Sequence, residues 1–155
     1  ASDPCNLFHL PRDACLLDED TESNLTGILK ALWGTSFDKL KRANGPCLCK
    51  WPGVLCERSA SLAWHVIGLD FEDKRLQGEI PDFLSKLPEL RSLVLRGQLQ
   101  GRIPASISAL WELRYLDLTG NQLEGEIPPL GRLPQLLSLS LAENKLSGNI
   151  EALGE

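Results

Sequence analysis

A motif of glycine, isoleucine and proline recurs through the second half of the chain at nearly constant spacing. It occupies residues 78–81, 101–104 and 125–128 and returns in shortened form at 148–150, which gives spacings of 23, 24 and 23 residues. An L-x-L pair of apolar residues precedes each copy, namely Leu69 and Phe71, Leu93 and Leu95, Leu116 and Leu118, and Leu139 and Leu141. A strand and a turn that return once per period predict a solenoid, in which each unit buries its apolar face against its neighbours.

The copy between residues 113 and 133 resembles the plant-type leucine-rich repeat, L-x-x-L-x-L-x-x-N-x-L-x-G-x-I-P-x-x-L-G-x-L. The residues that agree in order are Leu113, Leu116, Leu118, Asn121, Leu123, Gly125, Ile127, Pro128, Leu130, Gly131 and Leu133. The resemblance implies an α/β solenoid, a short right-handed stack with a parallel sheet on its concave face and a disulfide-bonded N-terminal cap of a helix and a hairpin. It also implies that Asn121 and Asn144 bond buried backbone in their turns, whereas Lys74 takes this position in the first repeat.

Residues 49–56, CKWPGVLC, are similar to the N-terminal cap signature C-x-W-x-G-V-x-C of the same family. This similarity implies a disulfide between Cys49 and Cys56. Three more cysteines remain, so the sequence allows Cys47 to pair with Cys5 or with Cys15, and it equally allows a Cys5–Cys15 bond. Because the cysteines lack paired C-x-x-C spacing, zinc is a poor alternative, and we expect neither a metal nor a cofactor.

Apolar residues at helical spacing from Leu25 to Trp33 predict an amphipathic helix that begins near residues 21–23 and ends at Gly34. A short second helix is expected within residues 36–42. Residues 51–56 and 66–71 are expected to form antiparallel strands around a loop at 57–62. The predicted organisation is an N-terminal arm at 1–20, a cap at 21–65, and four repeats at about 66–89, 90–112, 113–135 and 136–155.

The chain contains no methionine and begins with Ala1, so we expect that a targeting peptide has been removed. The expected location is therefore secreted and extracellular, or the oxidising lumen of an organelle. A glycosylation sequon at Asn24 makes this residue a candidate glycan acceptor. We expect its side chain to lie opposite the apolar stripe of the predicted helix.

Composition argues against several classes of function. The net charge is −5 and no block of lysine or arginine is present, so a nucleic-acid partner is not expected. No apolar run approaches the length of a membrane span, so direct membrane insertion is not expected either. The two histidines, His9 and His65, lie outside the repeats and no G-x-S-x-G motif occurs, so we expect a protein that is not an enzyme.

The predicted concave face is the candidate binding surface. If Leu93 and Leu95 point inward, alternation along the strand places Ser92, Val94 and Arg96 outward. Tyr115 then lies between Ser92 of the preceding repeat and Ser138 of the following one. The candidate contact residues for a protein or peptide partner are Tyr115, Arg91, Arg96, Arg114, Asp117 and Leu137. Alternatively, the chain is a structural subunit packed permanently inside a larger complex, lumenal or membrane-associated.

The last predicted repeat offers a second candidate contact. Its apolar residues are Leu139, Leu141, Leu146, Ile150 and Leu153, and no cap sequence follows them in this chain. Terminal repeats expose an apolar edge unless something covers it. We therefore expect a partner, a second copy of the chain or downstream sequence to pack against this edge.

Overall fold

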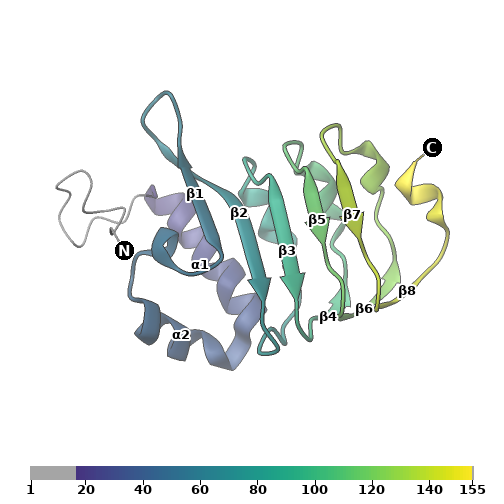
Figure 1. Ribbon diagram of the computed structural model, residues 1–155, viewed down its shortest axis with the longest axis horizontal. Coiled ribbons are helices and arrows are strands. Elements are labelled where there is room, and N and C mark those ends of the chain that lie inside the picture. Colours follow the sequence, from purple (N-terminus) through teal and green to yellow (C-terminus); the bar gives the residue numbers. More distant parts are fainter. Residues whose placement is uncertain (1–16, 155) are drawn as a thin grey trace.

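The structure is a computed structural model and describes residues 17–154. The chain begins with helices α1 (Glu19–Trp33) and α2 (Phe37–Asn44), followed by strands β1 (Val54–Arg58) and β2 (Trp64–Glu72) (Figure 1). The remaining strands are β3 (Ser92–Arg96), β4 (Gln100–Arg102), β5 (Tyr115–Asp117), β6 (Gln122–Glu126), β7 (Ser138–Ser140) and β8 (Lys145–Ser147). Short 3-10 helices at Asp82–Lys86, Ala105–Ala109, Leu130–Arg132 and Ile150–Leu153 complete the repeats.

The main sheet has five strands in the order β1-β2-β3-β5-β7, and Figure 1 shows them side by side along the molecule. β1 runs antiparallel to β2, and the other pairs are parallel. The predicted solenoid with a hairpin in its cap is therefore confirmed. Strand β1 starts later than the expected residue 51, because Trp51 lies in a turn where its Nε1 donates to the carbonyl oxygen of Gly45 at 2.9 Å, whereas β2 starts two residues earlier than expected.

The predicted disulfide is also confirmed, since Cys49 and Cys56 are bonded to each other. Cys5 and Cys15 lie outside the described residues, so the pairing of the remaining cysteines stays an open prediction. Cys47 is buried in the cap.

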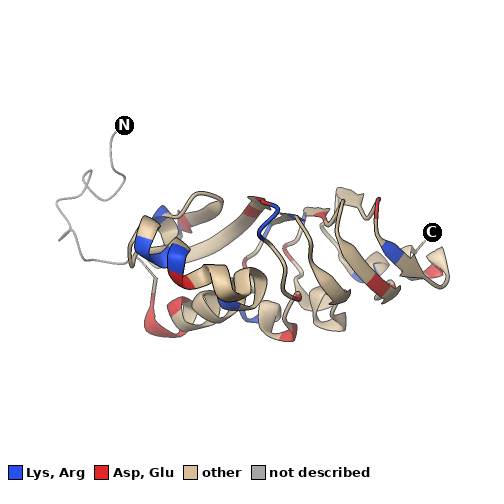
Figure 2. Cartoon of the chain, turned by 90° about the horizontal axis from the view of Figure 1, so that it is seen from below, with Lys and Arg blue, Asp and Glu red and all other residues tan. Residues whose placement is uncertain are grey.

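A second parallel sheet, in the order β4-β6-β8, was not predicted. Each glycine of the recurring motif in this sheet has a positive φ, namely 80° at Gly101, 81° at Gly125 and 86° at Gly148. The side chain from the previous coil crosses each of them, so an added Cβ would lie only 3.0 Å from Glu79 Cδ, 3.2 Å from Arg102 Cγ and 3.1 Å from Glu126 Cγ. The motif therefore favours glycine for its backbone conformation, and the crossing side chains leave little space above it. Seen from below in Figure 2, acidic and basic residues are interspersed along these repeats.

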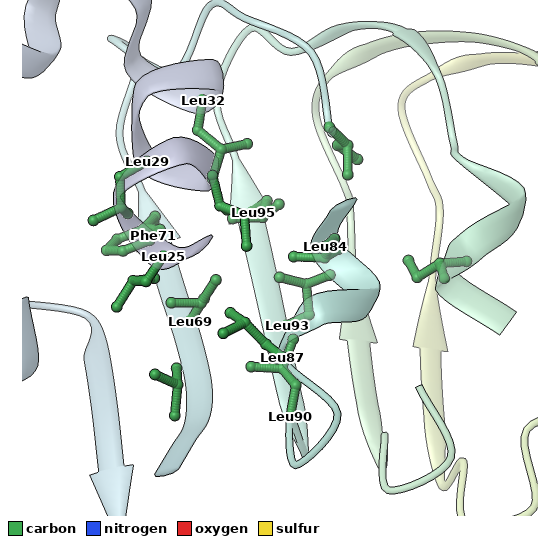
Figure 3. Packing of buried hydrophobic residues seen from close by; sticks show 14 of the residues in the cluster. Leu25, Leu29, Leu32, Leu69, Phe71, Leu84, Leu87, Leu90, Leu93 and Leu95 are labelled. Atoms are coloured by element: carbon green, nitrogen blue, oxygen red, sulfur yellow. The ribbon is translucent and has the colours of Figure 1, made fainter. Parts of the chain in front are cut away.

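One continuous hydrophobic core runs from the cap into the repeats. Leucines of α1 pack beside the inward residues of β2 and β3 and beside the 3-10 helix of the first repeat (Figure 3). The labelled residues of this cluster are Leu25, Leu29, Leu32, Leu69, Phe71, Leu84, Leu87, Leu90, Leu93 and Leu95. Helix α1 thus covers the first repeat in the way that each repeat covers the next.

Helix α1 begins and ends close to the predicted residues. The Asp18 side chain caps it by accepting from the Thr21 main-chain N–H at 2.9 Å, and Gly34 follows its last residue. Asn24 is half-buried, so the expectation that it lies opposite the apolar stripe is wrong. Asn24 precedes the buried Ile28 by four residues, and such positions share one face of a helix. The use of Asn24 as a glycan acceptor stays a prediction.

The turn asparagines bond backbone as predicted. Asn121, which is buried, accepts from the N–H groups of Gly97 and Leu99 at 3.1 and 3.0 Å. Its amide donates to the carbonyl oxygens of Leu95 and Leu118 at 2.7 and 2.9 Å. A single side chain therefore ties two consecutive turns together.

A candidate binding face on the five-stranded sheet

The solvent-facing side of the five-stranded sheet, here called the concave face, carries two of the predicted contact residues, Tyr115 and Asp117, in neighbouring rows across the strands. Parallel register aligns Gly68, Ser92, Tyr115 and Ser138 in one row and Asp70, Val94, Asp117 and Ser140 in the next. These are the rows that alternation along the strands predicts. Because each row crosses four repeats, residues more than twenty positions apart in the chain become neighbours.

Three of the predicted contact residues, Arg114, Tyr115 and Leu137, are exposed at or next to the first residues of β5 and β7. Tyr115 is 49% exposed and Leu137 is 72% exposed, and Arg114 lies beside them. The carbonyl oxygen of Arg114 accepts from the N–H groups of Leu137 and Ser138 at 2.8 and 3.0 Å, which fixes the two strands in register. Within residues 17–154 the Arg114 guanidinium has no hydrogen-bond or ion-pair partner.

Two other predicted contact residues, Arg96 and Asp117, form an ion pair with each other. Arg96 donates to the Asp117 carboxylate through two nitrogens, and its Nη1 lies 3.5 Å from a carboxylate oxygen of Glu72. Burial raises the pKa of the Asp117 carboxyl, but hydrogen bonds from Arg96 and Thr119 outweigh it, so the pKa lies below its ordinary value. Arg96 thus joins three adjacent strands through one charge network.

Arg91, another of the predicted contact residues, also forms an ion pair within the chain. Its guanidinium pairs with the Glu57 carboxylate of β1. The reason is that the antiparallel strand β1 closes this end of the sheet and brings Glu57 within reach. Nearby, His65 Nδ1 lies 3.5 Å from a carboxylate oxygen of Glu89.

Four exposed apolar residues were not predicted from the sequence, namely Leu55, Leu62, Phe83 and Trp111, and two of them lie near the concave face or the start of its strands. Leu55 on β1 is 50% exposed and lies over Gly68, where an added Cβ would stand 2.8 Å from Leu55 Cδ1. Leu55 thereby continues the row of Tyr115 into the cap. Trp111 is 66% exposed in the turn before β5. The sequence already marks Trp111 as unusual, because the equivalent positions of the neighbouring repeats hold Pro88 and Pro134.

At the last repeat, the predicted edge residues Leu139, Leu141, Leu146 and Leu153 are partly buried against the core, while Ile150 is 74% exposed. No helix of the described part of the chain is both long enough and apolar enough to span a membrane. Within residues 17–154, no group of three or more His, Cys, Asp or Glu side chains is arranged to hold a metal ion.

Comparison with known proteins identifies the architecture. The Leucine Rich Repeat family model matches residues 112–132. Among solved structures, the chain is similar to the ectodomain of the receptor kinase SOBIR1 from Arabidopsis thaliana, at 31% identity and a TM-score of 0.71 over 88% of this chain and 75% of that one. A search of curated protein sequences found no match.

Two further structures from Arabidopsis thaliana are similar. The GASSHO1/SCHENGEN3 ectodomain, in complex with CASPARIAN STRIP INTEGRITY FACTOR 2, has 32% identity and a TM-score of 0.76 over 86% of this chain, which spans only 16% of that one. A chain of the BIR3–SERK2 complex has 30% identity and a TM-score of 0.51 over 81% of this chain and 82% of that one. Given this identity over most of two solved chains, the protein belongs to the family of plant leucine-rich-repeat proteins.

Proposed function

We propose that this chain is an extracellular interaction module that binds a protein or peptide partner on its concave face. The observation that carries the proposal is the exposure of Tyr115, Arg114 and Leu137 at the start of adjacent strands, where the Arg114 guanidinium has no hydrogen-bond or ion-pair partner among residues 17–154. Tyrosine and arginine are enriched among residues that dominate binding energy. The related ectodomains support it, since one was solved with CASPARIAN STRIP INTEGRITY FACTOR 2 and another belongs to the BIR3–SERK2 complex.

The surroundings of Tyr115 favour an inserted side chain from the partner. Its row neighbours are Ser92 and Ser138, so the ring stands between small residues. Contact with an apolar partner residue would bury the ring and Leu137, at about 25 cal/mol for each Å² removed from water. The Arg114 guanidinium would then donate hydrogen bonds to a carboxylate or carbonyl group next to that apolar residue of the partner.

Arg96, Asp117 and Arg91 have a supporting role in this proposal. Arg96 and Asp117 hold each other, and Arg91 is held by Glu57, so none of the three loses much side-chain freedom when a partner binds. They would form the charged rim of the contact area. An extracellular location fits the Cys49–Cys56 bond, because disulfides persist in oxidising compartments.

Photo-crosslinking tests the proposal directly. A benzoylphenylalanine placed at Tyr115 should attach to the partner on irradiation, whereas one placed at the exposed Glu124 of β6, in the other sheet, should not. Binding of the captured partner should then weaken roughly thirtyfold or more, about 2 kcal/mol, in the double variant Arg114→Ala/Tyr115→Ala. The variant Glu79→Ala serves as the control. Crosslinking at 124 without crosslinking at 115 would show that the site is elsewhere.

A further inference from the structure

The hairpin of the cap ends in a loop that carries an exposed leucine. Residues 59–63 join β1 to β2, and Figure 1 shows this loop projecting beyond the edge of the sheet at which β3, β5 and β7 start. Leu62 in this loop is 64% exposed, and Ser61 and Ala63 on either side of it are exposed as well. Most of the leucine side chain is therefore left uncovered by residues 17–154.

The backbone of Leu62 has a conformation that leucine disfavours. Its φ is 67°, in the left-handed region that favours glycine and, after glycine, asparagine. The Leu62 N–H donates to the Ser59 carbonyl oxygen at 2.9 Å, and the Ser59 N–H donates to the Ala63 carbonyl oxygen at 2.8 Å. Short hairpin loops of this pattern place one residue in the left-handed region after a type I turn. A leucine at that position makes the loop less stable than glycine or asparagine would.

A second residue with a positive φ shows why Leu62 is unusual. Among residues 17–154, the other non-glycine residue in this region is Glu143, with a φ of 56°. Glu143 is charged and exposed, and it follows β7 at the position that Gly120 holds after β5. Leu62 instead combines an unfavourable backbone with an apolar side chain in water. Packing within the described chain explains neither, and backbone strain of this kind is typical of residues that contact another molecule.

We propose that Leu62 docks into an apolar pocket on the surface of a different protein. The loop tip is convex, so it fits a hollow in a macromolecule, whereas small ligands bind in concave sites. Residues 59–63 carry no charge, so a pocket can close around the tip without desolvating an ion. This contact is separate from the concave face and does not rest on the role of Tyr115.

Two other occupants match the loop less well. Membrane binding takes a larger apolar area or a set of basic residues, and the loop offers one leucine. A second copy of the chain would have to supply the pocket. Each of four hollows on the described part of the chain is lined in part by charged side chains, which are a poor match for leucine.

A stability measurement tests whether Leu62 serves the fold itself. Leu62→Asn removes the apolar side chain and introduces a residue that tolerates the left-handed region. We expect its urea midpoint to equal or exceed that of the wild type, because the leucine makes little packing contact that would offset its backbone strain. Leu62→Ala keeps the strain and should unfold at a lower midpoint than Leu62→Asn. A midpoint of Leu62→Asn below that of the wild type would show that Leu62 supports the fold, and would overturn the proposal.

Photo-crosslinking of the full chain tests the contact. A benzoylphenylalanine at residue 62 should attach to one protein when the chain is irradiated in an extracellular protein extract. That protein, once purified, should bind Leu62→Asn at least tenfold more weakly than the wild type and should bind Leu62→Met within threefold of it. Ser61→Ala changes the neighbouring residue of the same tip and is the matched control, which should bind like the wild type.

The outcomes separate the loop tip from the concave face and from the other occupants. Arg114→Ala/Tyr115→Ala alters the concave face and leaves the tip intact, so the two contacts are tested independently. The proposal is overturned if nothing is captured at residue 62, or if the captured protein binds Leu62→Asn like the wild type. It is also overturned if mass spectrometry identifies the captured protein as a second copy of this chain, or if phosphatidylcholine vesicles bind the wild type but not Leu62→Asn.

Discussion

Gly78 lies against the carbonyl oxygen of Ala31 so closely that a Cβ at residue 78 would stand 1.7 Å from that oxygen. The main-chain N–H groups of Gln77 and Gly78 also donate to the carbonyl oxygen of Leu32, at 3.2 and 3.3 Å. The end of α1 is thus joined to the first repeat by backbone contact. Gly101, Gly125 and Gly148 hold the same position in the motif but meet side chains of the preceding coil instead.

Replacement of Gly78 should separate the cap from the repeats. In Gly78→Ala the new methyl group collides with backbone that cannot rotate away, so we expect the free energy of unfolding to fall by about 2–4 kcal/mol. Thermal and urea unfolding followed by circular dichroism would measure this loss. Gly27→Ala is the control, because its Cβ would meet only the side chain of Phe83, at 3.1 Å, and alanine favours a helix. A Gly78→Ala protein as stable as Gly27→Ala would contradict this account of the joint.

Asn121 should be among the most sensitive positions of the repeats. Its side chain makes hydrogen bonds to four backbone groups of two turns, and Asn121→Ala leaves them unpaired in a buried place. We expect a loss of about 3–5 kcal/mol, measured by urea unfolding. The equivalent residue of the first repeat, Lys74, is exposed, so Lys74→Ala should change stability by less than about 0.5 kcal/mol. Similar effects of the two variants would rule out the proposed role of the asparagine.

Periodicity was sufficient to predict the main sheet but gave no sign of the second one. The L-x-L pairs fix which residues point inward, and Leu93 and Leu95 are fully buried as expected. Two of the three strands of the second sheet, Gln100–Arg102 and Lys145–Ser147, are only three residues long, and both are mostly polar. Their pairing follows from stacking of the repeats rather than from local strand propensity, so a reading of single segments misses them.

The binding face was predictable in position but not in detail. Alternation placed Tyr115 and Asp117 on the solvent side, yet it could not show that Arg96 would take Asp117 as its partner. It also could not show that Glu57 would reach Arg91, because that contact depends on how the cap hairpin closes the sheet. Ion pairs between repeats depend on which side chains can reach each other across the strands, and a single sequence does not specify those distances.

The disulfide of the cap should contribute measurably to stability. The bond between Cys49 and Cys56 closes a loop of ~8 residues, which the chain-entropy model values at about 2.5 kcal/mol. The double variant Cys49→Ser/Cys56→Ser should therefore unfold at lower urea concentration. The control is Ser59→Ala/Ser61→Ala, which changes two serines in the loop between β1 and β2. Equal midpoints for the two double variants would show that the bond adds nothing to the native fold.

The pairing of Arg96 with Asp117 should make stability depend on acid pH. The pKa of the Asp117 carboxyl is lowered in the folded chain, against about 3.9 in an unfolded one. A lowered pKa means that the carboxylate stabilises the fold above about pH 4, and that this contribution disappears as the pH falls through the folded value. Asp117→Asn should therefore be less stable than the wild type at pH 7, by about 1–2 kcal/mol, with a smaller difference at pH 2.5. Urea unfolding at both pH values would measure this difference in stability.

Asp70→Asn is the control, because it makes the same charge change in the same row of the sheet without removing an ion pair. Its difference from the wild type should therefore be smaller at pH 7. If the Asp117→Asn difference were the same at both pH values, the carboxylate would not be the group that holds Arg96.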